Sequence, residues 1–304
     1  MGHRLRSCVL VCVAVFTVAA VARAGDVPRS RAPEFHGQGI LFRLDKAGVA
    51  PSFVFGTLHS SDPRVTALPA PVRQAFDAAR TFAPETLLSE RDIDDFFAAA
   101  QFDDGRRLAD FFDPATMAAI RSGLGSEAPS EGALVRLKPW AVLLKLAERP
   151  RHPDEGPSLD TLLLIEAQRR RLTVIGLELP DEQISAFDAI PLPTQVALVK
   201  FLLDHRERLA RDHEAIVVAW LDRDIARLVA LGDAPARAYP VMAPHYAELS
   251  RHLVDNRSAQ MAHRLFVPLR TGRVFAAVGA LHLHGERGLL ALLRAQGYTV
   301  RRVY

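Results

Sequence analysis

Two short motifs each place a histidine three residues after a glycine that ends an apolar segment. Residues 53–59 (FVFGTLH) and 276–282 (AAVGALH) share the pattern Gly-x-Leu-His, and the two histidines are 223 positions apart. Side chains that follow a strand of an open α/β sheet project into the crevice where ligands bind. A neutral imidazole is a common metal ligand and a general base. The duplicated motif therefore predicts that His59 and His282 converge on one site; the alternative is that each only bonds a neighbouring carbonyl group.

Glu85 is the third candidate because it interrupts a stretch otherwise suited to burial, residues 81–88 (TFAPETLL). A carboxylate in a buried strand is costly unless it is paired or bound to a metal ion. Two histidines and one carboxylate form a donor set of hydrolytic metal sites, in which the ion polarises a carbonyl group and activates water. We predict that Glu85 joins the histidines either as a ligand or as the base toward that water. The alternative is an edge strand, favoured by Pro84, with Glu85 facing solvent.

Other sequence patterns that could indicate a catalytic site lack a required residue or are missing altogether. His284 lies two residues after His282, and we expect a solvated loop residue there, with a third imidazole ligand as the alternative. His213 and Glu214 begin like the zinc motif His-Glu-x-x-His, but Val217 stands where the second histidine is required. The sequence contains neither the P-loop pattern nor Gly-x-Ser-x-Gly. Nucleotide hydrolysis and α/β-hydrolase chemistry are therefore not expected.

Residues 1–24 have the organisation of a secretory signal peptide. Two arginines precede an uncharged, almost wholly apolar run over residues 8–21, and Ala-Arg-Ala ends the segment. We predict cleavage after Ala24 and export to the bacterial periplasm or the medium, with an uncleaved anchor as the alternative. Both cysteines, Cys8 and Cys12, lie in the leader, so the mature chain has no thiol for a disulfide, a metal site or a nucleophile.

The charge balance excludes one class of partner. The full chain has 38 basic and 35 acidic residues, and three of the arginines lie in the leader. The remaining chain therefore carries no formal net charge and lacks the basic surplus that binding to a phosphate backbone requires, so no nucleic-acid partner is expected. The leader is too short to span a ~30 Å hydrocarbon core comfortably, and no later apolar stretch is long enough. No stable membrane span is expected after cleavage.

Hydrophobic spacing predicts the elements that position these residues. Strands are expected at 39–44, 52–55, 81–89, 172–177, 274–278 and 298–303. Helices are expected at 68–80, in several segments between 91 and 170, from 181 to about 269 with breaks near Pro191, Pro235 and Pro244, and at 286–295. The strands cluster at both ends of the chain. This predicts one α/β (α+β) domain over residues 25–304, with a mixed central sheet built from N- and C-terminal strands and a large helical insertion.

In their order and spacing, these motifs resemble the TraB/PrgY/GumN family, whose best-studied relatives are the Tiki metalloproteases. The resemblance covers nearly the whole mature chain, from about Gly39 to Val303. It rests on the two Gly-x-Leu-His motifs, on Glu85, and on further landmarks at residues 137–141 (LKPWA), 159–162 (LDTL), 176–188 (GLELPDEQISAFD) and 285–300 (GERGLLALLRAQGYTV).

The resemblance implies a mixed sheet flanked by helices and a divalent-metal hydrolytic site built from the two motif histidines and Glu85. Manganese or cobalt supports activity in the Tiki branch, where the activity is peptide hydrolysis, and zinc is the other metal we consider. Glu178 and Arg257 are further catalytic candidates, because Glu178 follows a strand and Arg257 could clamp a carbonyl or carboxylate group. Ser258 follows Arg257 where the family usually has asparagine, and it can only partly replace a ligand-orienting amide.

The sequence thus predicts an exported, divalent-metal-dependent hydrolase that acts on peptide or amide bonds, with a peptide or a small molecule as its substrate. The alternative is a non-catalytic periplasmic protein in which the same histidines bind a ligand such as haem, which needs a deep apolar pocket beside an axial histidine. A third interpretation is a helical interaction module whose sheet crevice is vestigial. None of the motifs predicts a particular oligomeric state.

Overall fold

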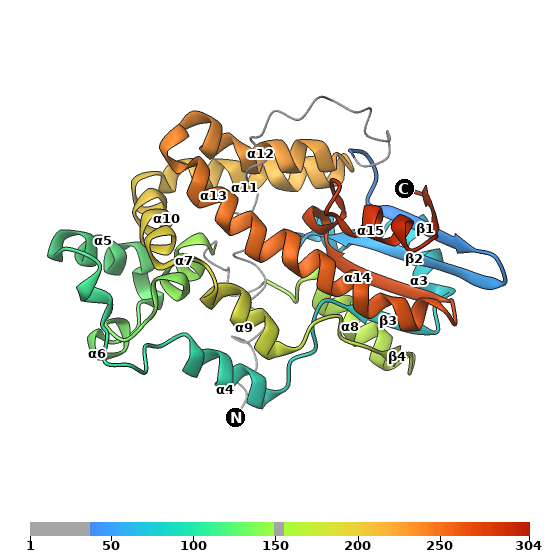
Figure 1. The fold of residues 1–304 in the computed structure, drawn as a ribbon, viewed down its shortest axis with the longest axis horizontal. Helices are drawn as coiled ribbons and strands as arrows, with labels where there is room; N and C mark the ends of the chain where they lie inside the picture. Colours follow the sequence, from blue (N-terminus) through green and yellow to red (C-terminus); the bar gives the residue numbers. More distant parts are fainter. Residues whose placement is uncertain (1–36, 149–154) are drawn as a thin grey trace.

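The computed structural model describes residues 37–148 and 155–304, so the expected leader and the segment that follows it, residues 1–36, lie outside the described part. The described chain forms a six-stranded sheet in the order β4-β3-β5-β2-β1-β6, together with many helices (Figure 1). Its two central strands, β5 (Val274–Gly279) and β2 (Val49–Thr57), come from opposite ends of the chain. The predicted α/β (α+β) class, with a mixed sheet of N- and C-terminal strands, is confirmed.

Of the six strands, only β1 runs antiparallel to the others. β4, β3, β5 and β2 are parallel, whereas β1 pairs antiparallel with both β2 and β6. β5 is an uninterrupted run of buried residues, as expected for a central parallel strand that is covered on both faces. The remaining strands are β1 (Leu41–Lys46), β3 (Thr81–Pro84), β4 (Thr173–Val174) and β6 (Thr299–Arg302).

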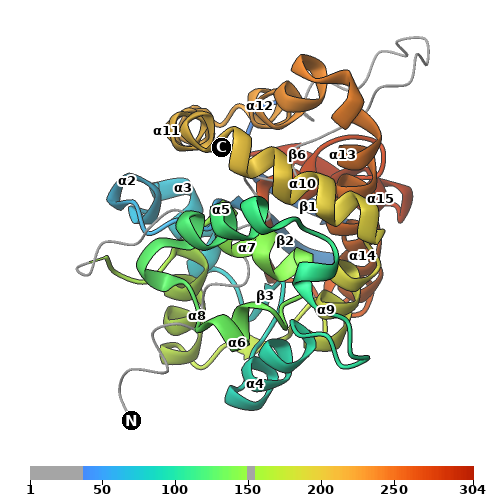
Figure 2. The same ribbon diagram turned by 90° about the vertical axis from the view of Figure 1, so that its left-hand side faces the viewer.

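Helices cover both faces of the sheet. Figure 2 shows α3 and α8 on one side of the strands and α14 and α15 on the other. Phe76 of α3 packs edge-on against Phe275 of β5 at 5.2 Å and against Phe82 of β3 at 5.7 Å between ring centroids. The helices around the sheet are α2 (Pro63–Thr66), α3 (Ala70–Asp77), α8 (Leu159–Arg169), α14 (Asn256–Leu269), α15 (Leu289–Ala295) and the 3-10 turn η7 (Ala280–Leu283).

A second core lies among the helices inserted between β3 and β5. The ring of Trp140 stacks on Phe187 at 5.2 Å, and its Nε1 donates a hydrogen bond of 2.7 Å to Asp188. The helices here are α4 (Glu90–Ala99), η3 (Leu108–Asp110), α5 (Pro114–Leu124), η4 (Gly125–Glu127), α6 (Glu131–Leu134), α7 (Pro139–Ala147), α9 (Pro180–Asp188), α10 (Leu192–Asp204), η5 (Pro240–Met242), α13 (Ala243–Ser250) and the π-helical turn η6 (Arg251–Asp255). α11 (Arg206–Leu221) and α12 (Ile225–Ala238) connect this core to the sheet.

Two strands are less than half as long as predicted. The stretch 81–89 is a strand only up to Pro84, so the expectation that Glu85 lies in the middle of a strand was wrong. Pro84 has no N–H to donate, and the backbone leaves the β5 ladder after Pro84 pairs with Ala277. The stretch 172–177 contributes only the two residues of β4, which is an edge strand and pairs with β3 alone.

Some helix boundaries also differ from the prediction. Pro235 does not break the helical block but lies buried inside α12, which continues beyond it. Pro191 and Pro244 do mark boundaries, since they lie at the beginnings of α10 and α13. The last helix begins at Leu289 instead of Glu286, because the preceding residues first form a turn. In this turn the N–H of Gly288 donates a hydrogen bond to the carbonyl group of Gly285.

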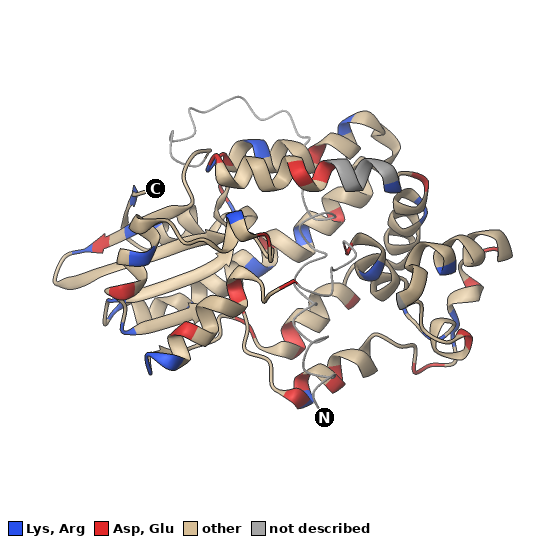
Figure 3. Cartoon of the chain, turned by 180° about the vertical axis from the view of Figure 1, so that it is seen from behind, with Lys and Arg blue, Asp and Glu red and all other residues tan. Residues whose placement is uncertain are grey.

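Within the described residues, no single helix has the length and apolarity to cross a membrane. Helices α9 and α10 have this length and apolarity only when taken together, as a pair bent by 84°. Charged residues of both signs are distributed over many elements in the view from behind (Figure 3). This distribution agrees with the even balance of acids and bases in residues 25–304.

Gly56, the glycine of the first histidine motif, lies where β2 meets the turn η7 of the second. A Cβ atom there would lie 2.7 Å from Cδ1 of Leu283 and 3.1 Å from Cα of Ala280, which is closer than side chains normally approach. The carbonyl group of Gly56 accepts a hydrogen bond of 2.9 Å from the buried Nε1 of Trp220. The missing side chain therefore lets the two motifs pack directly against each other.

We expect Gly56→Ala to lower the free energy of unfolding by about 1–3 kcal/mol, the usual cost of overpacking a core. The matched control is Gly132→Ala in α6, where a Cβ atom would meet nothing within 4 Å. The control should keep or raise stability, because alanine favours a helix over glycine. Urea denaturation, followed by circular dichroism, measures the free energy of unfolding of both variants. Equal stability of Gly56→Ala and the wild type would contradict the packing argument.

Candidate functional site

The topology brings the predicted site residues to one end of the sheet. The parallel strands β4, β3, β5 and β2 are neighbours in that order. Glu178 follows β4, Glu85 follows β3, His282 follows β5 and His59 follows β2. Because the carboxyl ends of parallel strands meet at the same end of a sheet, both carboxylates and both imidazoles lie along one row of strand ends.

His282 lies in the turn η7 and is 4% exposed. Its Nδ1 is 2.9 Å from Oγ of Ser258, a buried residue of α14. Its Nε2 is 3.8 Å from Oε1 of Glu85. The imidazole is thus held between a hydroxyl group on one side and a carboxylate on the other, and both ring nitrogens have polar neighbours.

Both oxygens of Glu85 accept hydrogen bonds. Oε1 accepts a bond of 2.6 Å from the N–H of Gly279, the glycine of the second motif, and Oε2 accepts one of 2.7 Å from Nη2 of Arg257. The side chain is 17% exposed, so the alternative of an edge residue that faces solvent does not describe it. The carboxylate instead links the end of β3 to the end of β5.

Arg257 lies on α14, is 4% exposed, and is bonded to two carboxylates of the chain itself. Besides Glu85, its guanidinium bonds Glu178 through Nε, at 2.8 Å from Oε1, and through Nη2. Glu178 is 2% exposed. The guanidinium therefore serves as the cation of a buried ion cluster, and its predicted role as a clamp for substrate stays a prediction.

His59 has a different set of neighbours. Its Nδ1 is 3.1 Å from Oδ2 of Asp160, whose Oδ1 accepts a hydrogen bond of 2.7 Å from Oγ1 of Thr57. Its side chain is 7% exposed, and its Nε2 is buried without a hydrogen-bond partner. A buried polar atom without a partner is uncommon and is a candidate ligand position.

The sequence interpretation missed the partners of both histidines. Asp160 lay within a landmark of the family resemblance but had no role assigned to it, and Ser258 was noted only because it replaces an asparagine. Asp160 and His59 are far apart in the sequence, so no local pattern could have paired them. Across residues 37–148 and 155–304, no group of three or more His, Cys, Asp or Glu side chains is gathered in positions that could hold a metal ion.

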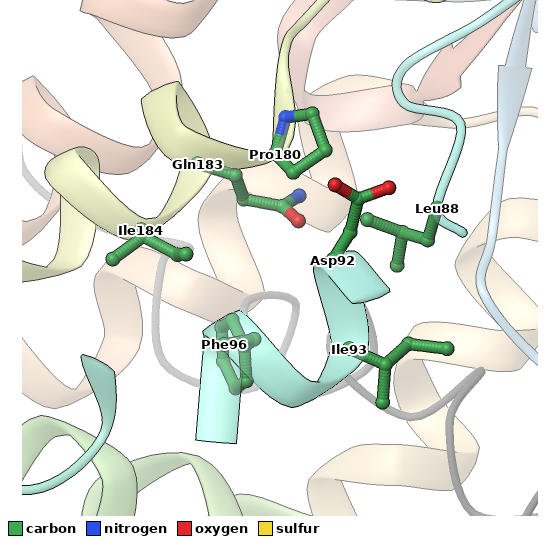
Figure 4. A pocket seen from close by; sticks show the side chains of 7 residues that line it. All are labelled: Leu88, Asp92, Ile93, Phe96, Pro180, Gln183 and Ile184. Carbon is green, nitrogen blue, oxygen red and sulfur yellow. The ribbon is translucent and has the colours of Figure 1, made fainter. Parts of the chain in front are cut away.

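Two cavities lie elsewhere, in the helical part of the molecule. A cavity of about 10 Å³, close to the size of one water molecule, lies between α4 and α9 and is lined by Phe96 and Gln183 among others (Figure 4). A larger one of about 260 Å³ is lined by Phe102, Lys138 and Gln195 among others. Neither is lined by the motif histidines, so neither provides the deep pocket beside an axial histidine that the haem-binding alternative needs.

Burial and charge shift the pKa values of the ion cluster in different directions. Burial would raise the pKa of Glu85, but the guanidinium of Arg257, the neighbouring His282 and the accepted hydrogen bonds lower it to about 2. Burial raises the pKa of Glu178, and Arg257 only partly opposes this shift. Burial also lowers the pKa of His282 to about 4, against the attraction of Glu85. His282 is therefore neutral at neutral pH.

We expect the metal-free protein to lose stability as the pH falls from 6.5 to 4. In this window the unfolded chain protonates His282 at its ordinary pKa of 6.5, whereas the folded protein keeps it neutral down to about 4. One proton costs about 1.4 kcal/mol per pH unit, which is roughly 3 kcal/mol over the window. His282→Asn should remove this part of the slope, and His263→Asn, at an exposed position of α14, should retain it. Urea denaturation at several pH values measures the slope, and no change in His282→Asn would contradict the assignment.

One family model matches the sequence over almost all of the described residues. It is the model of the TraB/PrgY/gumN family, and it matches residues 40–302. No curated protein and no solved structure gives a significant match to the chain. The matched region contains both histidine motifs, the row of strand ends and the helix that carries Arg257. Since the match covers far more than half of the chain, the chain belongs to the TraB/PrgY/gumN family.

Proposed function

We propose that this chain is a divalent-metal-dependent hydrolase that acts on peptide or amide bonds. The observation that carries the proposal is the order of three neighbouring parallel strands, β3, β5 and β2, which are followed by Glu85, His282 and His59. Open α/β sheets bind ligands outside this end of their strands. The resemblance to the Tiki metalloproteases supports the same chemistry and suggests a peptide or a small amide as the substrate.

The donor chemistry of these residues suits a divalent ion. The buried Nε2 of His59 has no hydrogen-bond partner, and an imidazole lone pair is a ligand for manganese, cobalt and zinc alike. Each oxygen of Glu85 accepts one hydrogen bond in the structure and retains a second lone pair. His282 would contribute Nε2, which lies 3.8 Å from Glu85. We therefore propose these three residues as the ligands of the ion, whose binding would have to draw them together, since the described residues gather no three such donors in positions that could hold a metal.

A bound ion would supply Lewis-acid polarisation of the scissile carbonyl group and activation of water. The chain's own residues would hold the donors in place. Oγ of Ser258 can accept a hydrogen bond from the Nδ1–H of His282, which leaves Nε2 unprotonated. Arg257 keeps Glu85 ionised, and Glu178 fixes the guanidinium of Arg257. We propose that Glu178 and Arg257 act on the reaction through Glu85.

We expect the wild-type protein, once stripped of metal, to take up Mn²⁺, Co²⁺ or Zn²⁺ stoichiometrically. His59→Ala and His282→Ala should each abolish this uptake, because each removes a donor. Isothermal titration calorimetry and elemental analysis measure binding, and far-UV circular dichroism verifies that the variants are folded. The control His263→Ala removes an exposed histidine of α14 and should bind like the wild type.

Stoichiometric uptake by the double variant His59→Ala/His282→Ala would refute the metal site. Hydrolysis is tested with a peptide library in the presence of the bound metal, with and without a chelator. Metal binding without cleavage of any peptide or amide would refute the hydrolase. A Soret band that forms on mixing with haem and disappears in the two histidine variants would favour the haem-binding alternative instead.

We also propose that the chain is exported by the leader expected at residues 1–24. Expression of the full gene product in a bacterium should yield a periplasmic or secreted protein whose first residue is Gly25, as measured by intact mass. Ala24→Leu should slow the cleavage, because the site requires a small residue. Recovery of the full-length protein from the cytoplasm would contradict export.

A further inference from the structure

We infer that Asp160 is a positioning residue for His59, whose imidazole it fixes in the tautomer that carries the proton on Nδ1 and leaves the Nε2 lone pair for a ligand. The inference rests on the proposed function for the identity of that ligand, a divalent cation. The underlying observation is that Oδ2 of Asp160 lies 3.1 Å from Nδ1 of His59, while Nε2 is buried without a hydrogen-bond partner.

Two contacts fix Asp160 beside the end of β2. Its Oδ1 accepts a hydrogen bond of 2.7 Å from Oγ1 of Thr57, the residue after the motif glycine. The backbone N–H of the neighbouring Leu159 donates a bond of 3.0 Å to the carbonyl group of Ser60. Asp160 also lies in the first turn of α8, an eleven-residue helix capped by Ser158, where the helix dipole favours a negative charge. The carboxylate is therefore held in position beside the end of β2.

The separation of the two side chains dictates where the imidazole carries its proton. An unprotonated Nδ1 would place an electron-rich nitrogen 3.1 Å from a carboxylate oxygen, and two acceptors at this distance repel each other. A proton on Nδ1 turns the contact into a charge-assisted attraction. Nδ1 and Oδ2 are not aligned as a hydrogen bond in this structure, so the contact acts through charge.

This arrangement leaves the other ring nitrogen available. The side chain of His59 is 7% exposed, and a buried polar atom without a partner costs free energy until a ligand satisfies it. Carboxylate partners of this kind orient metal-binding histidines and make them more basic ligands. Asp160 therefore prepares Nε2 of His59 to donate its lone pair to a cation.

Asp160→Asn tests the inference because it keeps the shape of the side chain and reverses one contact. The asparagine carbonyl group can still accept from Thr57, whereas its amide then faces Nδ1 as a donor and demands the opposite tautomer. Nitrogen-15 NMR of metal-free, histidine-labelled protein reports the tautomer, with the signal of His59 assigned through His59→Gln. We expect a protonated Nδ1 in the wild type and a protonated Nε2 in Asp160→Asn.

Calorimetric titration with Co²⁺ provides the second measurement. Asp160→Asn should lower the affinity by about 10–100-fold, the usual effect of losing such a partner. Asp160→Glu restores the carboxylate and should recover the wild-type tautomer and part of the affinity. The matched control is Asp181→Asn, which removes an exposed acid from the first turn of α9 and should change neither measurement.

The outcomes separate this inference from the proposed function. Protonation of Nε2 in wild-type His59, or the same tautomer in the wild type and Asp160→Asn, overturns the positioning role even where Co²⁺ binds. If the tautomer of His59 differs between the wild type and Asp160→Asn but the wild type binds no Co²⁺, the positioning role is supported and the proposed metal site is refuted. If Asp160→Asn both changes the tautomer of His59 and lowers the affinity for Co²⁺, the positioning role and the proposed metal site are both supported.

Discussion

The guanidinium of Arg257, buried between two carboxylates, is the interaction on which the end of the sheet depends. From α14 it bonds Glu178 after β4 and Glu85 after β3. Without a cation between them, two carboxylates could not lie so close in a buried position, because their repulsion and lost hydration would cost too much. Removing one partner of such a cluster typically costs about 3–5 kcal/mol. The side chain of Arg257 thus joins the ends of β3 and β4 to α14, a helix that is distant in the sequence.

The two histidines are positioned by the sheet but oriented by helices. The register of β2 and β5 pairs Thr57 with Gly279, so both motifs leave the sheet at the same level. Each imidazole then meets a partner from a helix of the surrounding layers: Asp160 of α8 contacts His59, and Ser258 of α14 contacts His282. The helical layers therefore do more than cover the sheet, because they supply polar partners to the histidines at its end.

The leucines of the repeated Gly-x-Leu-His pattern have the same packing role in both places. Leu58 and Leu281 are buried in the core around the sheet, at 3% and 8% exposed, and each anchors the turn that leaves its strand. The histidine that follows is consequently held close to the strand end. The glycine of the first motif allows the turn of the second to approach, whereas the N–H of Gly279 bonds Glu85. A short pattern thus combines an anchor, a close approach and a polar group.

The sequence by itself determined the fold class, the strands that form the sheet and the histidines that follow them, because these depend on local hydrophobic spacing and on where an apolar run stops. Which strand end faces which, and which side chain each histidine meets, was decided by the tertiary structure. The bond between Thr57 and Asp160 spans 103 positions and that between Arg257 and Glu85 spans 172, so no local period records them. Local patterns place a residue on an element, but the charge, burial and hydrogen bonds that give it chemistry come from segments that only folding brings together.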